Sequence, residues 1–343
     1  MNTHLLDVSD IPVVDSLVLG AMALQQVVDQ DSFNEEISIL SHQLPEGLIR
    51  VLTEFRLKRA GSPVVVISGL PVCDEDIGPT PSHWNNSKGK PTKTKEEIFL
   101  MLCGAILGDP ICWATQQGGK LVHDILPIKG QELLQTGASS DIKLEWHTEE
   151  AFHELRPDYI GLLCLRNPDG TATTVGTFDP SWMSEEDVEH LFQPYFQIRP
   201  DDSHLMTTDA QGLSDQLDQA QLIKSCDAMA RRDTAPKRVS VLSGAREDPF
   251  ICIDPAFMHE SGDSAQYSGS LERAIDAIDA HMEDLVLQPG DVAFIDNAKA
   301  VHGRKPFTSR HDGADRWLKR ISLTRDLSKS SHARIGNSNP IIY

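Results

Sequence analysis

The sequence predicts a mainly β protein with flanking helices, an α+β chain whose core is a double-stranded β-helix, the jelly roll of the cupin type. Many short runs rich in β-branched residues, separated by turn-forming residues, follow residue 144. His147 and Glu149 stand near the beginning of this β region, and a single histidine, His302, stands near its end. Metal-binding side chains placed in this way among many short strands favour a jelly roll.

The segments before residue 144 combine helices with a few strands. Leu44, Leu48, Leu52 and Phe55 recur at helical spacing and predict a helical N-terminal scaffold. In order, we expect this scaffold at about 1–60, a buried strand at 64–71, a loop at 78–91, a helix at 96–107 and two short strands within 113–127 that are joined at a Gly-Gly turn.

Short strands dominate the segments after residue 144. In order, we expect strands at 159–166, 171–175, 238–244 and 249–254, a helix at 271–285, a strand that leads from a turn at 287–290 towards 304, and a last strand at 317–325. The polar stretch at about 201–236 has little periodicity, which predicts a lid insertion over the site. The tail at about 328–343 is expected to be loose, and residues 1–343 to form a single domain.

The composition argues against several classes of partner. The 343-residue chain carries a formal net charge of −20, which opposes binding to nucleic acid or to an anionic membrane surface. The same charge is compatible with a cationic or zwitterionic small substrate. The six cysteines are scattered, so we expect buried thiols in a reducing cytoplasm. The start of the chain does not resemble a secretory leader, and no apolar run is long enough to span a membrane. We therefore expect a cytoplasmic protein, of an oligomeric state that the sequence leaves open.

The chemistry of the chain centres on His147 and Glu149. In an extended backbone, side chains two residues apart point to the same face, so an imidazole and a carboxylate can hold two adjacent positions of a metal ion. One more histidine, which we place at His302, completes a facial triad with open positions for substrate and O2. A second pair of this kind, His281 and Glu283, falls in a helical pattern, where residues two apart do not face each other. That second pair is therefore expected to lie on a helix surface.

Three blocks of sequence carry a family resemblance. They are the run 147–166, which begins at the His-Thr-Glu motif, the block 290–304, which ends in Val-His-Gly-Arg, and the block 310–320, which contains three further arginines. Over about residues 40–330 the chain resembles the clavaminate synthase-like group of iron(II)/2-oxoglutarate-dependent oxygenases. Within this group it is most similar to hydroxylases of free amino acids, with arginine β-hydroxylases first and asparagine oxygenases further off. Glutamate in place of aspartate at the carboxylate position is typical of this group.

The resemblance implies roles for individual residues. His147, Glu149 and His302 match the iron(II) ligands, and Arg316 matches the arginine that pairs with the distal carboxylate of 2-oxoglutarate. Arg320 matches the residue that holds the α-carboxylate of the substrate. The full set implied to contact the substrate is Gln116, Glu149, Asp201, Ser203, Asp254 and Arg320.

The implied substrate contacts differ from those of the arginine hydroxylases at one position. Asp254 matches the first of two aspartates that clamp the guanidinium group in the arginine hydroxylases, but Ala256 stands where the second would be. This change weakens the clamp on a cationic side chain and leaves arginine itself open as the substrate.

The resemblance implies a single oxygenase domain that hydroxylates a free L-amino acid at C3 or C4, with iron(II), 2-oxoglutarate and O2 as cofactors and succinate and CO2 as co-products. L-arginine or a close guanidino amino acid leads as the substrate, and natural-product biosynthesis is the implied setting. Citrulline, lysine or asparagine as substrate, and desaturation as outcome, are the alternatives. From other classes, a non-catalytic cupin-like binding protein and a zinc hydrolase with the same ligands also fit the motif.

Several of these residues also have a purely structural explanation. Arg316 and Arg320 fit exposed strand charges that pair with Asp312 and Asp315, and Asp254 fits an Asx turn. Gln117 is the alternative to Gln116, and three histidines have no role in the resemblance and are expected to be structural: His123, His153 and His311.

Overall fold

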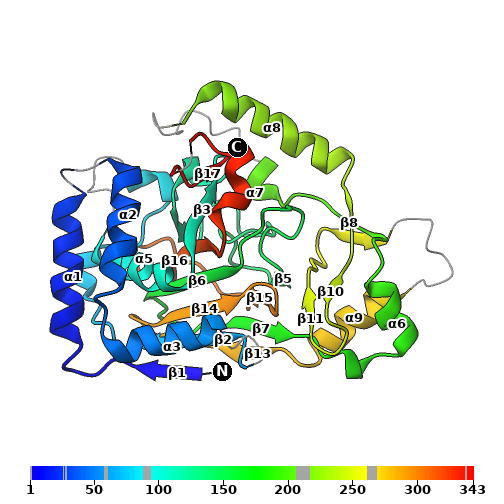
Figure 1. The fold of residues 1–343 in the computed structure, drawn as a ribbon, viewed down its shortest axis with the longest axis horizontal. Helices are drawn as coiled ribbons and strands as arrows, with labels where there is room; N and C mark the ends of the chain where they lie inside the picture. Colours follow the sequence, from blue (N-terminus) through cyan, green and yellow to red (C-terminus); the bar gives the residue numbers. More distant parts are fainter. Residues whose placement is uncertain are drawn as a thin grey trace.

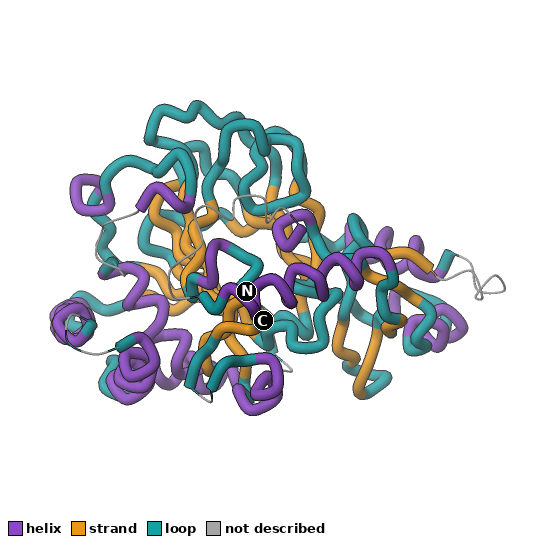
Figure 2. Tube along the Cα trace, turned by 90° about the horizontal axis from the view of Figure 1, so that it is seen from above, coloured by secondary structure: helices purple, strands orange, loops and turns teal. Residues whose placement is uncertain are grey.

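Two β-sheets form the core, with helices gathered at both ends of the molecule (Figures 1 and 2). The structure is a computed structural model, which describes residues 2–25, 27, 29–57, 61–87, 94–205, 217–260, 269–336 and 338–343. The larger sheet has the order β1-β2-β14-β6-β16-β3-β17, with β4 also paired to β16, and the smaller sheet has the order β13-β7-β15-β5. Two sheets of this kind are what the predicted jelly roll requires.

The strands of the larger sheet are β1 (Asn2–Leu5), β2 (Val64–Ser68), β3 (Asp109–Trp113), β4 (Val122–Ile125), β6 (Tyr159–Arg166), β14 (Val292–Asp296), β16 (Trp317–Thr324) and β17 (Ile341–Ile342). Those of the smaller sheet are β5 (Leu144–His147), β7 (Thr173–Thr177), β13 (Glu283–Leu285) and β15 (Ala300–Arg304). Two further sheets, with the orders β12-β8-β9 and β10-β11, comprise β8 (Phe196–Ile198), β9 (Arg238–Val239), β10 (Leu242–Gly244), β11 (Pro249–Ile251) and β12 (Met258–Glu260).

Successive side chains of the central strands pack on opposite faces of the larger sheet. In β2, Val64 and Val66 belong to a buried cluster shared with the smaller sheet, whereas Val65 and Ile67 belong to the cluster beneath the helices. Strands β6 and β14 alternate in the same way. Both faces of these strands are therefore buried, which is why their sequences read as nearly continuous apolar runs.

The helices that cover the larger sheet come from the first third of the chain. They are α1 (Ile11–Leu24), α2 (Gln30–Ser41), α3 (Glu46–Leu57) and α5 (Lys95–Leu107), with the short α4 (Asp74–Ile77) nearby in sequence. Helix α5 begins with a capping box, in which the Thr94 hydroxyl accepts from the Glu97 backbone N–H at 3.3 Å and the Glu97 carboxylate accepts from the Thr94 N–H at 3.0 Å. Helices α6 (Glu185–Leu191) and α9 (Ser270–Asp279) lie at the opposite end (Figure 1).

The helix predicted at 271–285 is too long. Helix α9 ends at Asp279, and Glu283–Leu285 form β13, which pairs antiparallel with β7. Leu285 lies opposite Thr173 and is buried in the cluster between the sheets. Pairing at the edge of the smaller sheet therefore outweighs the helical spacing of the local sequence.

The polar stretch at 201–236 contains more structure than predicted. Helix α7 (Asp202–Leu205) stands at its beginning and α8 (Gln219–Thr234) near its end, while residues 206–216 lie outside the described residues. Asp218 caps the N-terminus of helix α8, because its carboxylate accepts from the Gln221 N–H at 2.9 Å. It buries only Leu222, Ser225 and Met229, so its apolar stripe is too narrow to stand out in the sequence.

The prediction of a loose tail at 328–343 is wrong for the described residues. A 3-10 helix, Leu327–Ala333, is followed by β17, which pairs parallel with β3, and Ile341 and Ile342 are buried. The apolar pair completes the edge of the larger sheet. Of the two strands predicted within 113–127, only the second is found there, as β4; β3 ends at Trp113, where the first was expected to begin. Both β3 and β4 pair with β16 instead of with each other.

The six cysteines all lie in the described part of the chain and none forms a disulfide; Cys103, Cys112, Cys164 and Cys252 are buried. Among the described residues, no helix combines the length and the apolar character that a membrane crossing needs.

Candidate metal centre and substrate pocket

His147 and His302 are cross-strand neighbours in the smaller sheet. Strand β15 pairs antiparallel with β5, and His302 lies directly opposite His147. The next residue of β15 is Gly303, where a Cβ atom would lie only 2.6 Å from the carbonyl oxygen of Leu144. A glycine is therefore needed where the two strands approach most closely, and this approach brings the two imidazoles together.

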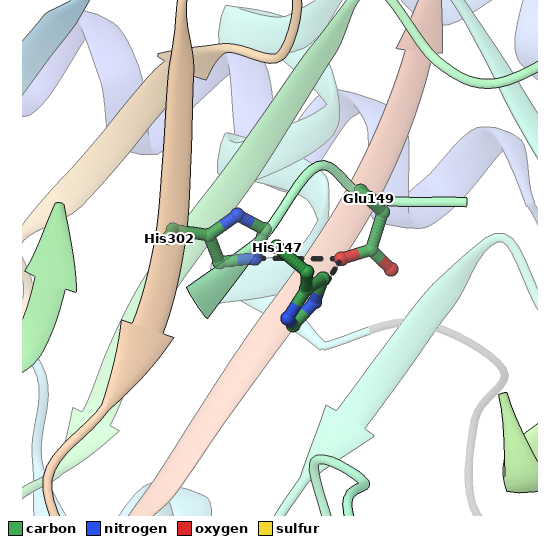
Figure 3. Close-up of side chains that lie close together, drawn as sticks. All are labelled: His147, Glu149 and His302. Carbon is green, nitrogen blue, oxygen red and sulfur yellow. Dashed lines mark ion pairs between the residues drawn. The ribbon is translucent and has the colours of Figure 1, made fainter. Parts of the chain in front are cut away.

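Glu149 follows the end of β5 and joins the two histidines (Figure 3). Its Oε2 atom lies 3.6 Å from His147 Nε2 and 3.4 Å from His302 Nε2, and the candidate ligand atoms of the three residues all lie within 4.8 Å of one another. Asn297 fixes the backbone of Glu149: its side-chain amide accepts from the Glu149 N–H at 2.8 Å and donates to the Glu149 carbonyl at 3.0 Å.

The polar groups around this cluster favour a cation. His147 Nδ1 lies 2.8 Å from the Glu145 carbonyl, a contact that requires the proton on Nδ1 and leaves Nε2 as a ligand atom. Burial disfavours the imidazolium form of His147, but Glu149 and the nearby Asp254 outweigh it and raise the pKa of His147 to about 9. Burial raises the pKa of Glu149, but Arg320 and the histidines outweigh it and hold that pKa well below its ordinary value. Burial lowers the pKa of His302.

The donor set fits the iron site that the resemblance implies. Two imidazole nitrogens and one carboxylate oxygen on one side of an ion form the facial triad of non-heme iron oxygenases. Glu149 Oε2 is buried, faces both Nε2 atoms and has no hydrogen-bond partner among the described residues, as a metal-ligating oxygen requires.

All the residues predicted for the site line one pocket. They are Gln116, His147, Glu149, Asp201, Ser203, Asp254, His302, Arg316 and Arg320. These residues come from β5, β15, β16, helix α7 and connecting loops, so the topology brings together positions that are far apart in the sequence.

Two buried arginines form one basic region of the pocket. Arg316 donates to the Thr173 hydroxyl at 3.2 Å, and its Nε atom is buried without a hydrogen-bond partner in the described part of the chain. Arg304, which the sequence did not single out, donates to the carbonyl oxygens of Ser139 and Ile142. Burial lowers the pKa of Arg316 to about 10, and burial with the charge of Arg316 lowers that of Arg304 to about 9. Two desolvated cations side by side suit an anion with paired oxygens, such as a carboxylate.

The alternative of exposed strand arginines is wrong for Arg316 and Arg320. Arg316 is buried, and Arg320 makes an ion pair with Glu149 Oε1 inside the pocket. Asp315 instead accepts hydrogen bonds from the backbone N–H groups of Arg310 and His311.

His123, expected to be structural, lines the pocket. It lies opposite Arg320 on the neighbouring strand β4, and its Nδ1 accepts from Arg320 Nη2 at 2.9 Å. Burial and the charge of Arg320 lower the pKa of His123 to about 3, which keeps it a neutral acceptor. No local pattern indicates this contact, because the pairing of β4 with β16 creates it.

The region beyond the histidines is acidic. Asp254 is nine-tenths buried and accepts from the Ala256 N–H at 3.1 Å, so the Asx turn expected as an alternative exists while the residue also lines the pocket. Burial, with the nearby charge of Asp201 adding, raises the pKa of Asp254 to about 6. Among the described residues no ion pair compensates Asp254, and a bound cation would do so.

Two further contacts tie Ser203 to the pocket wall. Ser203 accepts from Gln116 Nε2 at 2.9 Å, and the Asp201 carboxylate accepts from the Ser203 N–H at 2.7 Å. Gln117, the alternative to Gln116, holds the backbone of Asp124 through both ends of its amide. Gln116 keeps a buried carbonyl oxygen without a partner among the described residues.

The second His-x-Glu pair does not join the site. His281 follows the end of α9 and stacks on Trp182 with ring centroids 3.8 Å apart, and Glu283 begins β13. The prediction that this pair does not chelate agrees with these positions, although the helix assumed for it is wrong. Sequence reasoning also missed Glu150, which lines the pocket, and His204, with which Glu150 forms a buried ion pair.

Comparison with known proteins agrees with this geometry. A family model described as taurine catabolism dioxygenase TauD, TfdA family, matches residues 213–322. The chain is 40% identical over 344 residues, the full length of both proteins, to enduracididine beta-hydroxylase of Streptomyces hygroscopicus. It is 42% identical over 301 residues, 88% of this chain and 87% of the relative, to L-ornithine/L-arginine 3-hydroxylase of Catenulispora acidiphila.

A solved structure of the non-heme iron oxygenase OrfP, in complex with Fe, succinate and (3S)-hydroxy-L-Arg, superimposes with a TM-score of 0.91, at 37% identity and with all of both chains covered. Other structures of OrfP contain Fe with alpha-ketoglutaric acid, L-homoarginine or L-canavanine. The predicted mainly β fold with a jelly-roll core is thereby confirmed. Relatives this similar over the whole length, together with the pocket described above, show that the chain belongs to the clavaminate synthase-like iron(II)/2-oxoglutarate-dependent oxygenases.

Proposed function

We propose that this enzyme hydroxylates the side chain of a free L-amino acid with a guanidino group, at C3 or C4. The observation that carries the proposal is the polarity of the pocket. Asp254 is a buried carboxylate without a compensating ion pair among the described residues, and Arg304 and Arg316 are buried guanidinium groups in another region. Such a pocket favours a cationic side chain and a carboxylate co-substrate bound at the same time.

The enzyme is a 2-oxoglutarate-dependent dioxygenase that uses iron(II), 2-oxoglutarate and O2. His147, Glu149 and His302 would hold the iron, and Arg316 the distal carboxylate of 2-oxoglutarate. When bound, iron(II) with 2-oxoglutarate and O2 supplies the oxidant for hydroxylation of a C–H bond, with succinate and CO2 as co-products. The binding-protein and zinc-hydrolase alternatives find no support among the relatives.

The pocket residues that contact the amino acid would hold it in one orientation. Arg320 carries a fork of donors suited to the α-carboxylate, and Glu149 and Gln116 offer acceptors near the α-amino group. Asp254 would then receive the distal cation, so that both ends of the substrate are fixed. A C–H bond held at one distance from the metal is what selects one carbon over its neighbours.

Residues 201–236 supply Asp201 and Ser203 to the same pocket, and we propose that this stretch acts as a lid within a single oxygenase domain. A lid excludes water from the reacting C–H bond and commits the bound substrate. The absence of a second aspartate at Ala256 is expected to cost about 1–3 kcal/mol of guanidinium binding. Asp201, which interacts electrostatically with Asp254, offsets part of this loss.

A mixed assay tests the substrate directly. Purified protein with iron(II), 2-oxoglutarate and O2 is offered arginine, a cyclic guanidino amino acid, citrulline, lysine and asparagine together, and products with one added oxygen atom are measured by mass spectrometry. We expect a guanidino amino acid to be consumed first. Asp254→Asn should lower turnover of the cationic substrates while sparing citrulline, and Ala256→Asp should favour arginine further. The proposal fails if Asp254→Asn leaves the order of the substrates unchanged.

A further inference from the structure

Three pairs of consecutive residues meet beside the pocket. Gln116, Glu149 and Ser203 belong to the predicted substrate contacts, and each is adjacent in the chain to one member of a second group: Thr115, Glu150 and His204. The members of this second group bond to one another. His204 Nδ1 lies 2.7 Å from the Thr115 hydroxyl, and His204 Nε2 lies 2.7 Å from the Glu150 carboxylate.

The second group is enclosed by protein. His204 is 1% exposed, and its ring packs edge-on against Phe152 and Trp113 with centroids 5.1 and 6.3 Å away. The Glu150 and His204 side chains are fully covered. A hydrogen-bonded pair at such a site is difficult to open, because separation would leave a buried carboxylate without a partner.

The backbone conformation of Glu150 explains how two consecutive glutamates, Glu149 and Glu150, reach different partners. Glu150 has φ of +54°, in the left-handed region that residues other than glycine seldom adopt. The turn that follows is closed by the His153 N–H, which donates to the Glu150 carbonyl at 2.8 Å. With this turn, Glu149 faces the two histidines of the metal cluster while Glu150 faces His204. A strained conformation of this kind persists only where the surroundings hold it.

We propose that Thr115, Glu150 and His204 form a latch that holds helix α7 against the barrel and thereby presents Ser203 and Asp201 to the amino acid. His204 is then a positioning residue, which acts through its neighbour Ser203 and the Gln116 bond to it. This inference rests on the proposed function, because it assigns the latch a role in binding the amino acid and none in binding 2-oxoglutarate.

The same residues have a competing interpretation as a metal site. Ligand atoms of Glu150, Asp201 and His204 lie within 4.8 Å of one another. Both ring nitrogens of His204 are already engaged, however, one by Thr115 and the other by Glu150. The hydrogen-bonded latch accounts for all of these contacts without an ion.

Thr115 gives the cleanest test, because Thr115→Val removes the hydroxyl at nearly constant shape and Thr115→Ser keeps it. We expect Thr115→Val to raise KM for the amino acid about tenfold and KM for 2-oxoglutarate less than twofold. Thr115→Ser should behave as the wild type. Glu150→Gln, whose amide can still donate to a neutral His204, should lie between them, and His204→Phe should show a larger effect than Thr115→Val.

Hydrogen exchange of the protein without substrates provides a readout that does not need turnover. Backbone amides of residues 202–205 should exchange faster in Thr115→Val and His204→Phe than in the wild type or Thr115→Ser. Asp187→Asn is the matched control, because Asp187 bonds Ser270 and Arg273 in an ion-paired cluster at the α6 and α9 end of the molecule. It should lower the melting temperature without changing either KM or exchange in α7.

The outcomes separate the two proposals. A wild type that hydroxylates no free amino acid removes the proposed function, while the exchange data still report on the latch. Equal rises of both KM values in Thr115→Val, or unchanged exchange in α7, overturn the latch. A second equivalent of bound iron or zinc in the wild type that is lost in His204→Phe also overturns it, in favour of the metal site.

Discussion

At the scale of single residues, the metal cluster leads to a direct prediction. His147→Ala and His302→Ala should each abolish turnover and reduce iron retained after anaerobic reconstitution, because each removes one of the three proposed ligands. His281→Ala is the matched control, since His281 stacks on Trp182 outside the pocket. The iron content of the wild type and of the three variants tests this assignment. Retention of iron by His302→Ala with loss by His281→Ala would show that the third ligand is misassigned.

Arg316 should be sensitive even to a conservative change. A lysine keeps the charge but replaces a planar fork of donors by a single point, so Arg316→Lys is expected to raise KM for 2-oxoglutarate at least tenfold, or about 1.4 kcal/mol. KM for the amino acid should change much less, because Arg320 remains in place. Initial rates with each substrate varied in turn give both constants. An unchanged requirement for 2-oxoglutarate would remove Arg316 from that role.

Asp254 predicts a pH dependence that depends on the substrate. Burial raises its pKa to about 6, so the group is a carboxylate above this pH and neutral below it. For a cationic substrate, kcat/KM should therefore rise between pH 5 and 7, as Asp254 gains its charge (roughly one pH unit on either side of the pKa). Neutral citrulline should lack this step, and Asp254→Asn should remove it for arginine. The same step with citrulline would assign it to another group.

Site residues could be predicted from the sequence where their chemistry allows few residue types. His147, Glu149 and His302 are identifiable as candidate iron ligands because few side chains bind iron, and Arg316 and Arg320 as candidate carboxylate partners because the resemblance implies these roles. Other pocket residues could not be found in this way. His123 meets Arg320 only through the pairing of β4 with β16, and Glu150 meets His204 only through the fold, so no local pattern indicates either contact.

At the scale of elements, the central strands were predicted because burial on both faces leaves nearly continuous apolar runs, and helix α5 was predicted from the helical pattern of residues 96–107. The errors have a common cause in pairing between distant segments. Strand β13 was taken for helix because its spacing suits both structures, and its pairing with β7 decides between them. Strand β17 has only two residues, too few to show a strand pattern, and it is a strand because it pairs with β3. Helix α8 has too narrow an apolar stripe to be recognised.

The close contact of β5 with β15 can be tested at Gly303. In Gly303→Ala the added Cβ would meet the Leu144 carbonyl at 2.6 Å, so the strands must move apart. We expect a loss of about 1–3 kcal/mol in the free energy of unfolding and weaker iron retention, because His147 and His302 face each other across these strands. Gly20→Ala, in α1 with nothing within 4 Å, should instead stabilise the protein by about 0.5–1 kcal/mol. Urea denaturation and metal analysis compare the two.

At the scale of the whole molecule, strand β16 joins the pocket to the helical layer. Arg320 and its cross-strand partner His123 line the pocket. The preceding residue, Lys319, lies opposite Asp124 and donates to it at 2.6 Å, and it donates to Glu97 of α5 at 2.6 Å. Because successive residues of a strand point to opposite faces, this pair of strands carries a proposed substrate contact, Arg320, on one face and a buried charge cluster on the other.

This arrangement predicts that stability and substrate binding respond together to a change at Lys319. Lys319→Met leaves Glu97 and Asp124 buried without their cation, which is expected to cost about 3–5 kcal/mol of the free energy of unfolding. KM for the amino acid should rise as well, because Arg320 is the next residue of the strand. The double variant Lys319→Met/Glu97→Gln should recover part of the stability, since it removes one uncompensated charge while glutamine keeps the capping box of α5. Urea denaturation and initial rates measure both effects. If Lys319→Met were as stable as the wild type, the cluster would not compensate charge, and β16 would position Arg320 through its apolar packing alone.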